Sequence, residues 1–185
     1  MPILPIVTYN DEVLREVAKP VTEDSPEVQK LIDDMLETMY NADGLGLAAP
    51  QIGKSVQIFV MDPDPVLPED MEDKPGALVC INPEILEKSG DKIPMDEGCL
   101  SIPEVTDKVS RPETITITYL DRTFNEHTET YDGWISRIIQ HEYDHLQGVL
   151  FVDYLSLFRR RMHRKDLAEI QSGEREAKYP ILPKI

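Results

Sequence analysis

The amino-acid sequence predicts an α+β fold in which short, mostly antiparallel strands pack around a central helix, with a further helix at the C-terminal end. Apolar residues recur at helical spacing in three stretches, and short strand-like segments lie between them. The chain has 185 residues, of which 41% are hydrophobic, so it can bury a substantial core. We therefore expect one domain over residues 1–185, with the C-terminal helix and tail beginning near residue 155.

The first predicted helix begins at Ser25-Pro26-Glu27, where a capping serine precedes a proline at the first helical position and an acid in the first turn. Residues 41–44 end the helical pattern. Between these limits one apolar stripe runs along the helix through Val28, Leu31, Ile32, Met35, Leu36 and Met39.

Small residues fill the next segment, from Gly44 to Gln51, which neither helix nor strand chemistry favours. We expect its backbone to pack closely against another part of the molecule. Strand-like residues follow over 56–61 and again over 78–82, and the acidic, proline-rich stretch 62–75 between them is predicted to be an exposed loop.

Two strands and a second helix are predicted next. Residues 114–119 alternate as a half-buried strand does, and residues 127–131 can pair with them. The helix is expected from Gly133 to about Gln147, with Asp132 as its cap and Gly148 as its terminator. A short strand over 149–152 and a third helix from about residue 155 complete the expected order of elements.

The charge of the chain limits its partners. A formal charge of −16 argues against general affinity for nucleic acids or anionic membranes, because both would be repelled. The apolar start, residues 1–7, is short and broken by prolines and has no basic leader, so it is a poor secretory signal, and no stretch is long enough for a membrane span. We expect a cytoplasmic protein with reduced cysteines.

The second helix carries an HExxH motif, His141-Glu142-Tyr143-Asp144-His145. Residues four apart share a helix face, so both imidazoles can bind one cation while Glu142 reaches a water bound to it. The motif predicts a metal-dependent hydrolase. The alternative interpretation is a buried histidine pair beside a surface acid, without a metal.

A catalytic metal site needs a third protein ligand and an open position for water. The metzincin pattern is excluded, because Phe151 stands where its third histidine would be. A thermolysin-like site would use a later glutamate, with Glu169 as the candidate. A stronger candidate is Cys99, because a thiolate binds divalent transition metals well and Gly98 lets backbone approach a site closely. Cys80 lies inside an apolar strand and is expected to be a small buried residue.

Three segments stand in order along the chain: Gly44-Leu45-Gly46-Leu47-Ala48-Ala49-Pro50-Gln51, Glu97-Gly98-Cys99-Leu100-Ser101 and Gln140-His141-Glu142-Tyr143-Asp144-His145. Together they resemble the three signature motifs of bacterial peptide deformylases, the enzymes that remove the formyl group from the N-terminus of nascent proteins. The similarity extends from the N-terminal segment through residues 153–155.

The resemblance implies a role for each matching residue. Cys99, His141 and His145 would bind one divalent metal ion per chain, with ferrous iron expected and zinc, nickel or cobalt as alternatives. Glu142 would be the general acid/base while hydroxide formed at the metal attacks the formyl carbonyl. The Gln51 side chain and the backbone N–H of Leu100 would donate to the carbonyl oxygen.

The resemblance indicates the residues that would bind the substrate less directly than the metal ligands. Gly44 and Gly46 leave room for an extended peptide, and Trp134 and Ile138, one turn apart on the second helix, are candidates for lining an apolar slot for methionine. Thr106 stands where many relatives carry an arginine, so a contact to the substrate backbone is in question there. The loop 62–75 is also longer than the family pattern leads us to expect.

The stretch from Arg159 to Lys165 concentrates five positive charges in seven residues of an acidic chain. Such a run is usually a solvated helix face, but in relatives a basic C-terminal helix docks on the ribosome, which makes a local contact with ribosomal RNA a hypothesis. We expect a monomer that acts on N-formylmethionyl nascent peptides and does not bind membranes. An HExxH zinc metalloprotease is the main alternative, and a non-catalytic metal-binding module is the third.

Overall fold

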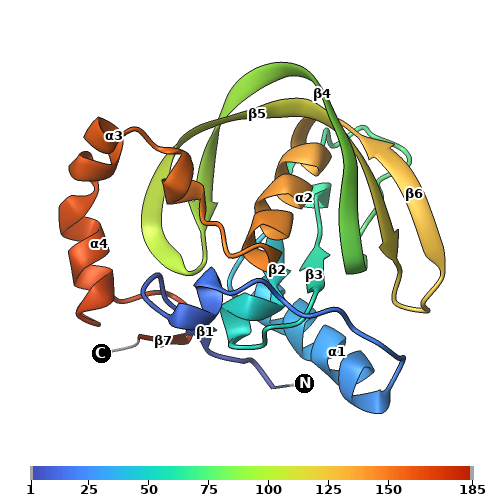
Figure 1. The fold of residues 1–185 in the computed structure, drawn as a ribbon, viewed down its shortest axis with the longest axis horizontal. Coiled ribbons are helices and arrows are strands. Elements are labelled where there is room, and N and C mark those ends of the chain that lie inside the picture. Colours follow the sequence, from blue (N-terminus) through green and yellow to red (C-terminus); the bar gives the residue numbers. More distant parts are fainter. Residues whose placement is uncertain (1, 184–185) are drawn as a thin grey trace.

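A computed structural model describes residues 2–183, within which seven strands form a five-stranded antiparallel sheet and a two-stranded parallel sheet. The larger sheet has the order β2-β3-β4-β5-β6, and the mixture of helices with mostly antiparallel strands confirms the predicted fold class (Figure 1). Its strands are β2 (Gly46–Ala48), β3 (Ile58–Met61), β4 (Leu78–Cys99), β5 (Ile102–Leu120) and β6 (Glu126–Tyr131).

The long antiparallel pair formed by β4 and β5 arches over a central helix (Figure 1). These strands have 22 and 19 residues, so the segments predicted at 78–82 and 114–119 are only the start of one and the end of the other. Most of the added part of β4, residues 84–95, is exposed and carries no alternating apolar pattern. Pairing with β5, rather than burial, keeps it extended.

The tip of this hairpin brings the second motif of the chain to a tight turn. Cys99 ends β4 and pairs with Ile102, the first residue of β5, so Leu100 and Ser101 form the turn itself. The predicted partner of the 114–119 segment is confirmed, since β6 pairs with the end of β5 from Ile115↔Tyr131 to Leu120↔Glu126.

The first helix, α1 (Pro26–Asn41), agrees with the prediction at both ends. The Ser25 hydroxyl accepts a hydrogen bond from the Val28 N–H at 3.2 Å and so caps the helix. Ile32, Met35 and Met39 are fully buried, and they pack in one cluster with side chains of β2 and β3. Burial of this stripe, more than helix propensity, holds α1 in place.

The central helix, α2 (Gly133–Leu146), starts and stops where the sequence indicated. Asp132 occupies the cap position, but its side chain makes no capping hydrogen bond, so that part of the prediction was wrong. Gly148 has φ +72° and donates to the His145 carbonyl, while the Val149 N–H reaches the Asp144 carbonyl at 2.9 Å. This pair of hydrogen bonds is a Schellman motif.

The chain after α2 differs from the prediction in two ways. No strand forms at 149–152, because the Asp153 carboxylate accepts the Leu150 N–H at 3.0 Å and stabilises a 3₁₀ turn, η4 (Phe151–Tyr154). The third helix is divided at His163 into α3 (Leu157–Met162) and α4 (Arg164–Gln171). The tail then forms β7 (Ile181–Leu182), which pairs in parallel with β1 (Ile6–Val7).

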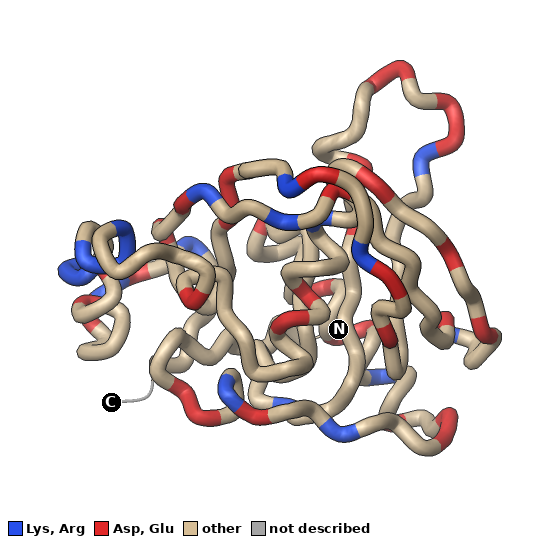
Figure 2. Tube along the Cα trace, turned by 45° about the horizontal axis from the view of Figure 1, so that its top comes forward, with Lys and Arg blue, Asp and Glu red and all other residues tan. Residues whose placement is uncertain are grey.

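The remaining connections are short turns and one projecting loop. The predicted exposed loop is confirmed over residues 68–73, and it extends away from the body of the molecule with its acidic residues (Figure 2).

Across residues 2–183, no helix has the length and apolar character that crossing a membrane requires. The short helical turns are η1 (Glu12–Arg15), η2 (Ala49–Ile52) and η3 (Asp64–Val66).

Replacing Gly148 tests how tightly the end of α2 packs on the N-terminal segment. A Cβ at Gly148 would lie 2.5 Å from the Arg15 carbonyl oxygen, and its positive φ already disfavours a side chain. We expect Gly148→Ala to lower the free energy of unfolding by roughly 2 kcal/mol or more in urea denaturation. Gly76→Ala is the matched control. Gly76 also has a positive φ, of +65°, but a Cβ added there would lie within 4 Å of none of the described atoms. Equal losses in the two variants would contradict the packing argument.

Candidate active site

Three side chains from distant parts of the chain offer metal-ligating atoms to one point. One ligand atom from each of Cys99, His141 and His145 lies within 4.8 Å of the others. The Cys99 Sγ atom is 3.4 Å from His145 Nε2. The helical spacing of four places both imidazoles on one face of α2, and the hairpin tip of β4 and β5 supplies the thiol.

The chemistry of this donor set fits a divalent transition metal. His141 Nδ1 lies 2.9 Å from Glu97 Oε1, which leaves Nε2 as the atom available to a metal. Burial lowers the pKa of His145 well below its usual value and so favours the neutral imidazole that a ligand must be. Burial acts in the same direction on His141, but hydrogen bonds with Cys99 and Glu97 outweigh it and raise the pKa of His141, so a metal would have to displace that proton. Three protein ligands are the number typical of a catalytic metal site, which would keep one position for water or substrate, whereas a structural site would use four.

Glu97 is buried and contacts three basic side chains, those of Arg111, Arg137 and His141. Arg111 binds it through two hydrogen bonds, from Nε to Oε2 at 2.7 Å and from NH2 to Oε1 at 2.9 Å. Arg137 adds a contact from NH1 to Oε2 at 2.9 Å. Burial by itself would raise the pKa of Glu97, but hydrogen bonds from His141 and Arg111 outweigh it and hold the pKa well below its usual range. Glu97 therefore stays ionised.

The same arginine links this carboxylate to the helix. Arg111 NH1 donates to Asp144 Oδ2 at 2.7 Å, and the Tyr154 hydroxyl donates to the same oxygen at 2.9 Å. The Arg111 guanidinium also stacks 4.5 Å from the centre of the Tyr154 ring. Asp144 lies between the two histidines in sequence, so the network fixes the turn of α2 that presents them.

Glu142 lies beside the candidate metal centre and is almost fully buried, with 4% of its surface exposed. Its Oε2 atom has no hydrogen-bond partner within residues 2–183. Burial raises the pKa of Glu142 to about 7. A Cβ added at Gly46 would lie 2.5 Å from Glu142 Oε1, so a side chain at position 46 would displace the carboxylate.

Gln51 reaches the site from η2, with its amide orientation set by the backbone. The Ala48 N–H donates to Gln51 Oε1 at 2.9 Å, which turns Nε2 toward the hairpin tip. There Nε2 lies 3.4 Å from Cys99 Sγ and 3.3 Å from Ser101 Oγ. The amide nitrogen therefore faces the candidate ligand Cys99 on one side and the Ser101 hydroxyl on the other.

A cleft of about 310 Å³ opens above these groups. All four residues predicted for the substrate side line it, namely Gly44, Gly46, Trp134 and Ile138. Leu100 and Thr106 lie in the same wall. Ile138 is buried and Trp134 is 37% exposed, so they form the inner and outer parts of one apolar surface.

The chain matches the model of the family described as "Polypeptide deformylase" over residues 3–161. The chain belongs to this family. Deformylases are enzymes, so the predicted family and the prediction of an enzyme are confirmed.

Individual deformylases agree with this assignment. The peptide deformylase of Salinibacter ruber is 51% identical over 186 residues, covering 98% of this chain and 95% of the relative. The solved structure of a Legionella pneumophila deformylase has a TM-score of 0.82 and 41% identity, covering 94% of this chain and 98% of the other. A deformylase from Ehrlichia chaffeensis, solved in complex with actinonin, has a TM-score of 0.83 and 39% identity, covering 95% and 100%.

Several residues around the candidate active site were not predicted from the sequence. Arg111, Arg137 and Tyr154 follow no motif spacing, and nothing in one sequence indicates that they meet a common carboxylate. Glu97 belongs to the second motif, two residues before Cys99, but its function as the partner of His141 depends on the hairpin. A buried carboxylate needs cationic partners, and only this general requirement could have indicated that basic side chains lie next to Glu97.

The two cysteines provide a test of the metal centre. We expect Cys99→Ala to lower the metal content of the purified protein severalfold or more in elemental analysis, because one of three candidate ligands is lost. Cys80 is 1% exposed in the core of the sheet, and Cys80→Ala should retain the metal of the parent protein. Equal metal content in the parent and in Cys99→Ala would show that the thiol is not a ligand.

Proposed function

We propose that this protein removes the formyl group from the N-terminal formylmethionine of nascent polypeptides, in the cytoplasm, as a monomeric catalytic domain. One observation carries the proposal: a thiol, two imidazoles and a buried carboxylate converge at the base of a cleft lined by small and apolar residues. This combination suits hydrolysis of a small amide at the end of an extended chain.

Cys99, His141 and His145 would hold one divalent cation, and ferrous iron is the ion we propose, with zinc, nickel or cobalt as substitutes. When bound, such an ion lowers the pKa of a coordinated water to roughly 7 and polarises an amide carbonyl. The protein supplies the donor geometry, since Glu97 orients the His141 ring and the Schellman end of α2 holds the backbone that carries His145.

Glu142 would move the proton in both steps of the hydrolysis. Its buried carboxylate can accept a proton from the attacking water and deliver it to the departing amine nitrogen. The unpartnered Oε2 atom supports this assignment, because a buried oxygen without a hydrogen bond is available to a water or substrate. The absence of a side chain at Gly46 leaves room for the carboxylate in this position.

Gln51 and Leu100 would stabilise the negative charge that develops on the formyl oxygen. The Ala48 N–H fixes the Gln51 amide, so an N–H of that amide is already directed at the site before substrate arrives. The backbone N–H of Leu100, at the hairpin tip, is the second proposed donor. Preorganised donors of this kind typically contribute about 100-fold each to turnover.

The substrate would lie along the cleft with its methionine side chain against Ile138 and Trp134. Gly46 begins β2, an edge strand of the sheet where an extended peptide can pair through its backbone, and Gly44 lies two residues before it. Backbone pairing tolerates many sequences, as an enzyme for most nascent chains requires. Thr106 lines the cleft with a short uncharged side chain, so binding would depend more on the strand edge than on a cation there.

Glu142→Gln is the decisive variant for this function. We expect it to keep the parent's metal content but to lose about 100-fold or more of its deformylation of formyl-Met-Ala-Ser, because the amide cannot accept a proton. Release of free amine and elemental analysis measure the two quantities. Glu37→Gln, an exposed position on α1, is the control and should retain full activity. Full activity of Glu142→Gln would refute its assigned role, and cleavage of an unformylated protein by the parent would favour an HExxH zinc metalloprotease.

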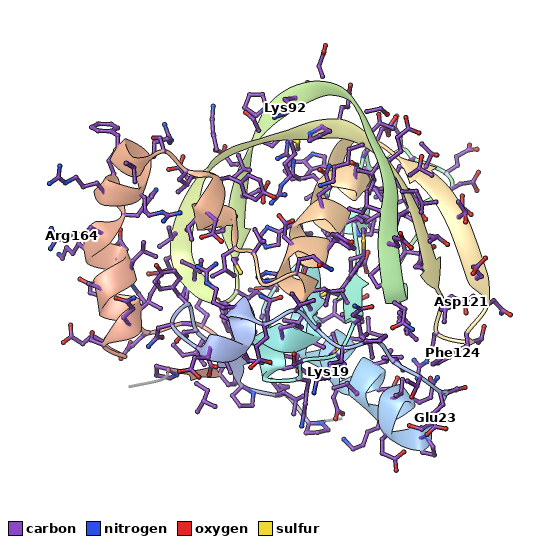
Figure 3. The ribbon with its side chains drawn as sticks, viewed as in Figure 1. Lys19, Glu23, Lys92, Asp121, Phe124 and Arg164 are labelled. Atoms are coloured by element: carbon purple, nitrogen blue, oxygen red, sulfur yellow. The ribbon has the colours of Figure 1, made fainter. Side chains whose placement is uncertain are left out.

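We also propose that the basic C-terminal helices contact ribosomal RNA. Arg159 is bound to Asp107, and Arg160 donates to the Val152 carbonyl, so these two are committed to the fold. Arg161 and Arg164 are exposed and have no ion-pair partner in the described part of the chain. Positive charge gathers at this end of the molecule, and Arg164 lies on its outer side (Figures 2 and 3).

The ribosome contact is tested by co-sedimentation at increasing salt. We expect the parent protein to sediment with ribosomes at low salt and to be released as salt rises, because each phosphate contact displaces counterions. The double variant Arg161→Glu with Arg164→Glu should lose this binding. Lys88→Glu with Lys92→Glu changes the same charge on the exposed arch of β4 and should bind normally. Binding unaffected by the arginine variant would rule out this surface.

A further inference from the structure

The C-terminal tail after α4 returns to the candidate active site. Residues 172–180 lead from the outer helix back to β7, which pairs with β1, and the Ile6 N–H donates to the Pro180 carbonyl at 2.9 Å. This tail lies beyond the segment that matches the family model, which ends at residue 161. Its contacts with the site are therefore made by residues outside the three motifs.

Arg175 fastens the start of the tail to the cleft wall. Its NH1 atom lies 3.0 Å from Glu104 Oε2, and its NH2 atom contacts Asp166 and lies 3.1 Å from Glu169 Oε2. Glu104 lies just after the hairpin turn, has φ +61° and lines the cleft. The tail, α4 and the start of β5 are thus joined through one guanidinium.

Tyr179 makes the contact that matters for the chemistry. Its hydroxyl donates to the Leu100 carbonyl oxygen at 2.8 Å, and its ring packs in the same cluster as the Leu100 side chain. Tyr179 also lines the cleft. Burial, together with the nearby Cys99 and Glu104, raises the pKa of Tyr179, so the hydroxyl stays protonated as a donor.

The hairpin turn is held at both of its residues, but by different parts of the chain. Ser101 is bound twice, by the Tyr9 N–H to its carbonyl at 2.9 Å and by Gln51 Nε2 to its hydroxyl at 3.3 Å. The Leu100 carbonyl is bound by the tail. The Leu100 N–H lies in the peptide plane shared with Cys99 and the Leu100 carbonyl lies in the plane shared with Ser101, so the two groups are coupled only through the φ and ψ angles of Leu100. Cys99 pairs with Ile102, and the hydrogen bond to the Leu100 carbonyl limits how far the turn between these two residues can rotate.

We propose that Tyr179 is a positioning residue, which fixes the Leu100 turn so that its backbone N–H can serve as a donor to the carbonyl oxygen of the substrate. This inference rests on the proposed function, in which Leu100 is such a donor. Tyr179 would not touch the reacting atoms. It acts by holding the hairpin tip at the Leu100 carbonyl, whereas Gln51 and Tyr9 hold it at Ser101.

The test is steady-state kinetics of Tyr179→Phe with formyl-Met-Ala-Ser. The ring and its packing are kept, and the hydrogen bond to Leu100 is removed. We expect kcat to fall about tenfold with KM changed less than about twofold, because a misplaced donor weakens stabilisation of the transition state more than ground-state binding. Replacing Tyr179 with 4-aminophenylalanine, whose N–H can donate to the same carbonyl, should restore most of kcat.

Tyr131→Phe is the matched control for a merely structural effect. Tyr131 is also partly buried and its hydroxyl shares a 3.3 Å hydrogen bond with Tyr119, away from the cleft. Both variants should lose a similar few degrees of Tm, but only Tyr179→Phe should lose kcat. Unchanged kcat, or a rise in KM alone, would overturn the proposal, whereas a parent protein without deformylase activity would refute the proposed function itself.

Discussion

The buried ion pair between Arg111 and Glu97 is the interaction on which the rest of the site depends. Arg111 has 1% of its surface exposed, and it joins β4 through Glu97 to α2 through Asp144. The His141 ring is hydrogen-bonded to the same Glu97 carboxylate. The orientation of His141, a candidate metal ligand, therefore depends on Arg111. Arg111 lies on β5, a strand that carries no candidate ligand.

Such a network persists because its charges are balanced and its hydrogen bonds are satisfied. Two guanidinium groups, Arg111 and Arg137, face two carboxylates, Glu97 and Asp144. Removing one partner of a buried pair typically costs 3–5 kcal/mol, whereas an exposed pair such as Arg122 with Asp33 contributes roughly 0–1 kcal/mol. The cost of burying these charges is offset by their mutual attraction and hydrogen bonds, which also tie β4 and β5 to α2.

Local chemistry was enough to predict the helices but not the full length of the strands. Ser25, Pro26 and the apolar stripe define α1, and Gly148 ends α2, because capping and left-handed turns depend on a few neighbouring residues. Residues 84–95 show no apolar alternation, since both faces of that part of β4 are largely exposed. The strand forms there because β5 supplies hydrogen-bond partners, and the alternation of buried and exposed residues lies on β5, from Glu104 to Arg111, and not on β4.

The sequence by itself determined the donor set, because a spacing of four on one helix places His141 and His145 together and the motif around Cys99 names the third group. Only the tertiary structure decided what surrounds those donors. Glu97 and Ile93, the partner of Arg111 in the β4–β5 register, are four residues apart and so lie on one face of β4, where Arg111 can reach the carboxylate. Likewise, Tyr179 meets Leu100 only after the tail has paired with β1. Contacts of this kind depend on register and chain return, which are properties of the folded chain and not of any single segment.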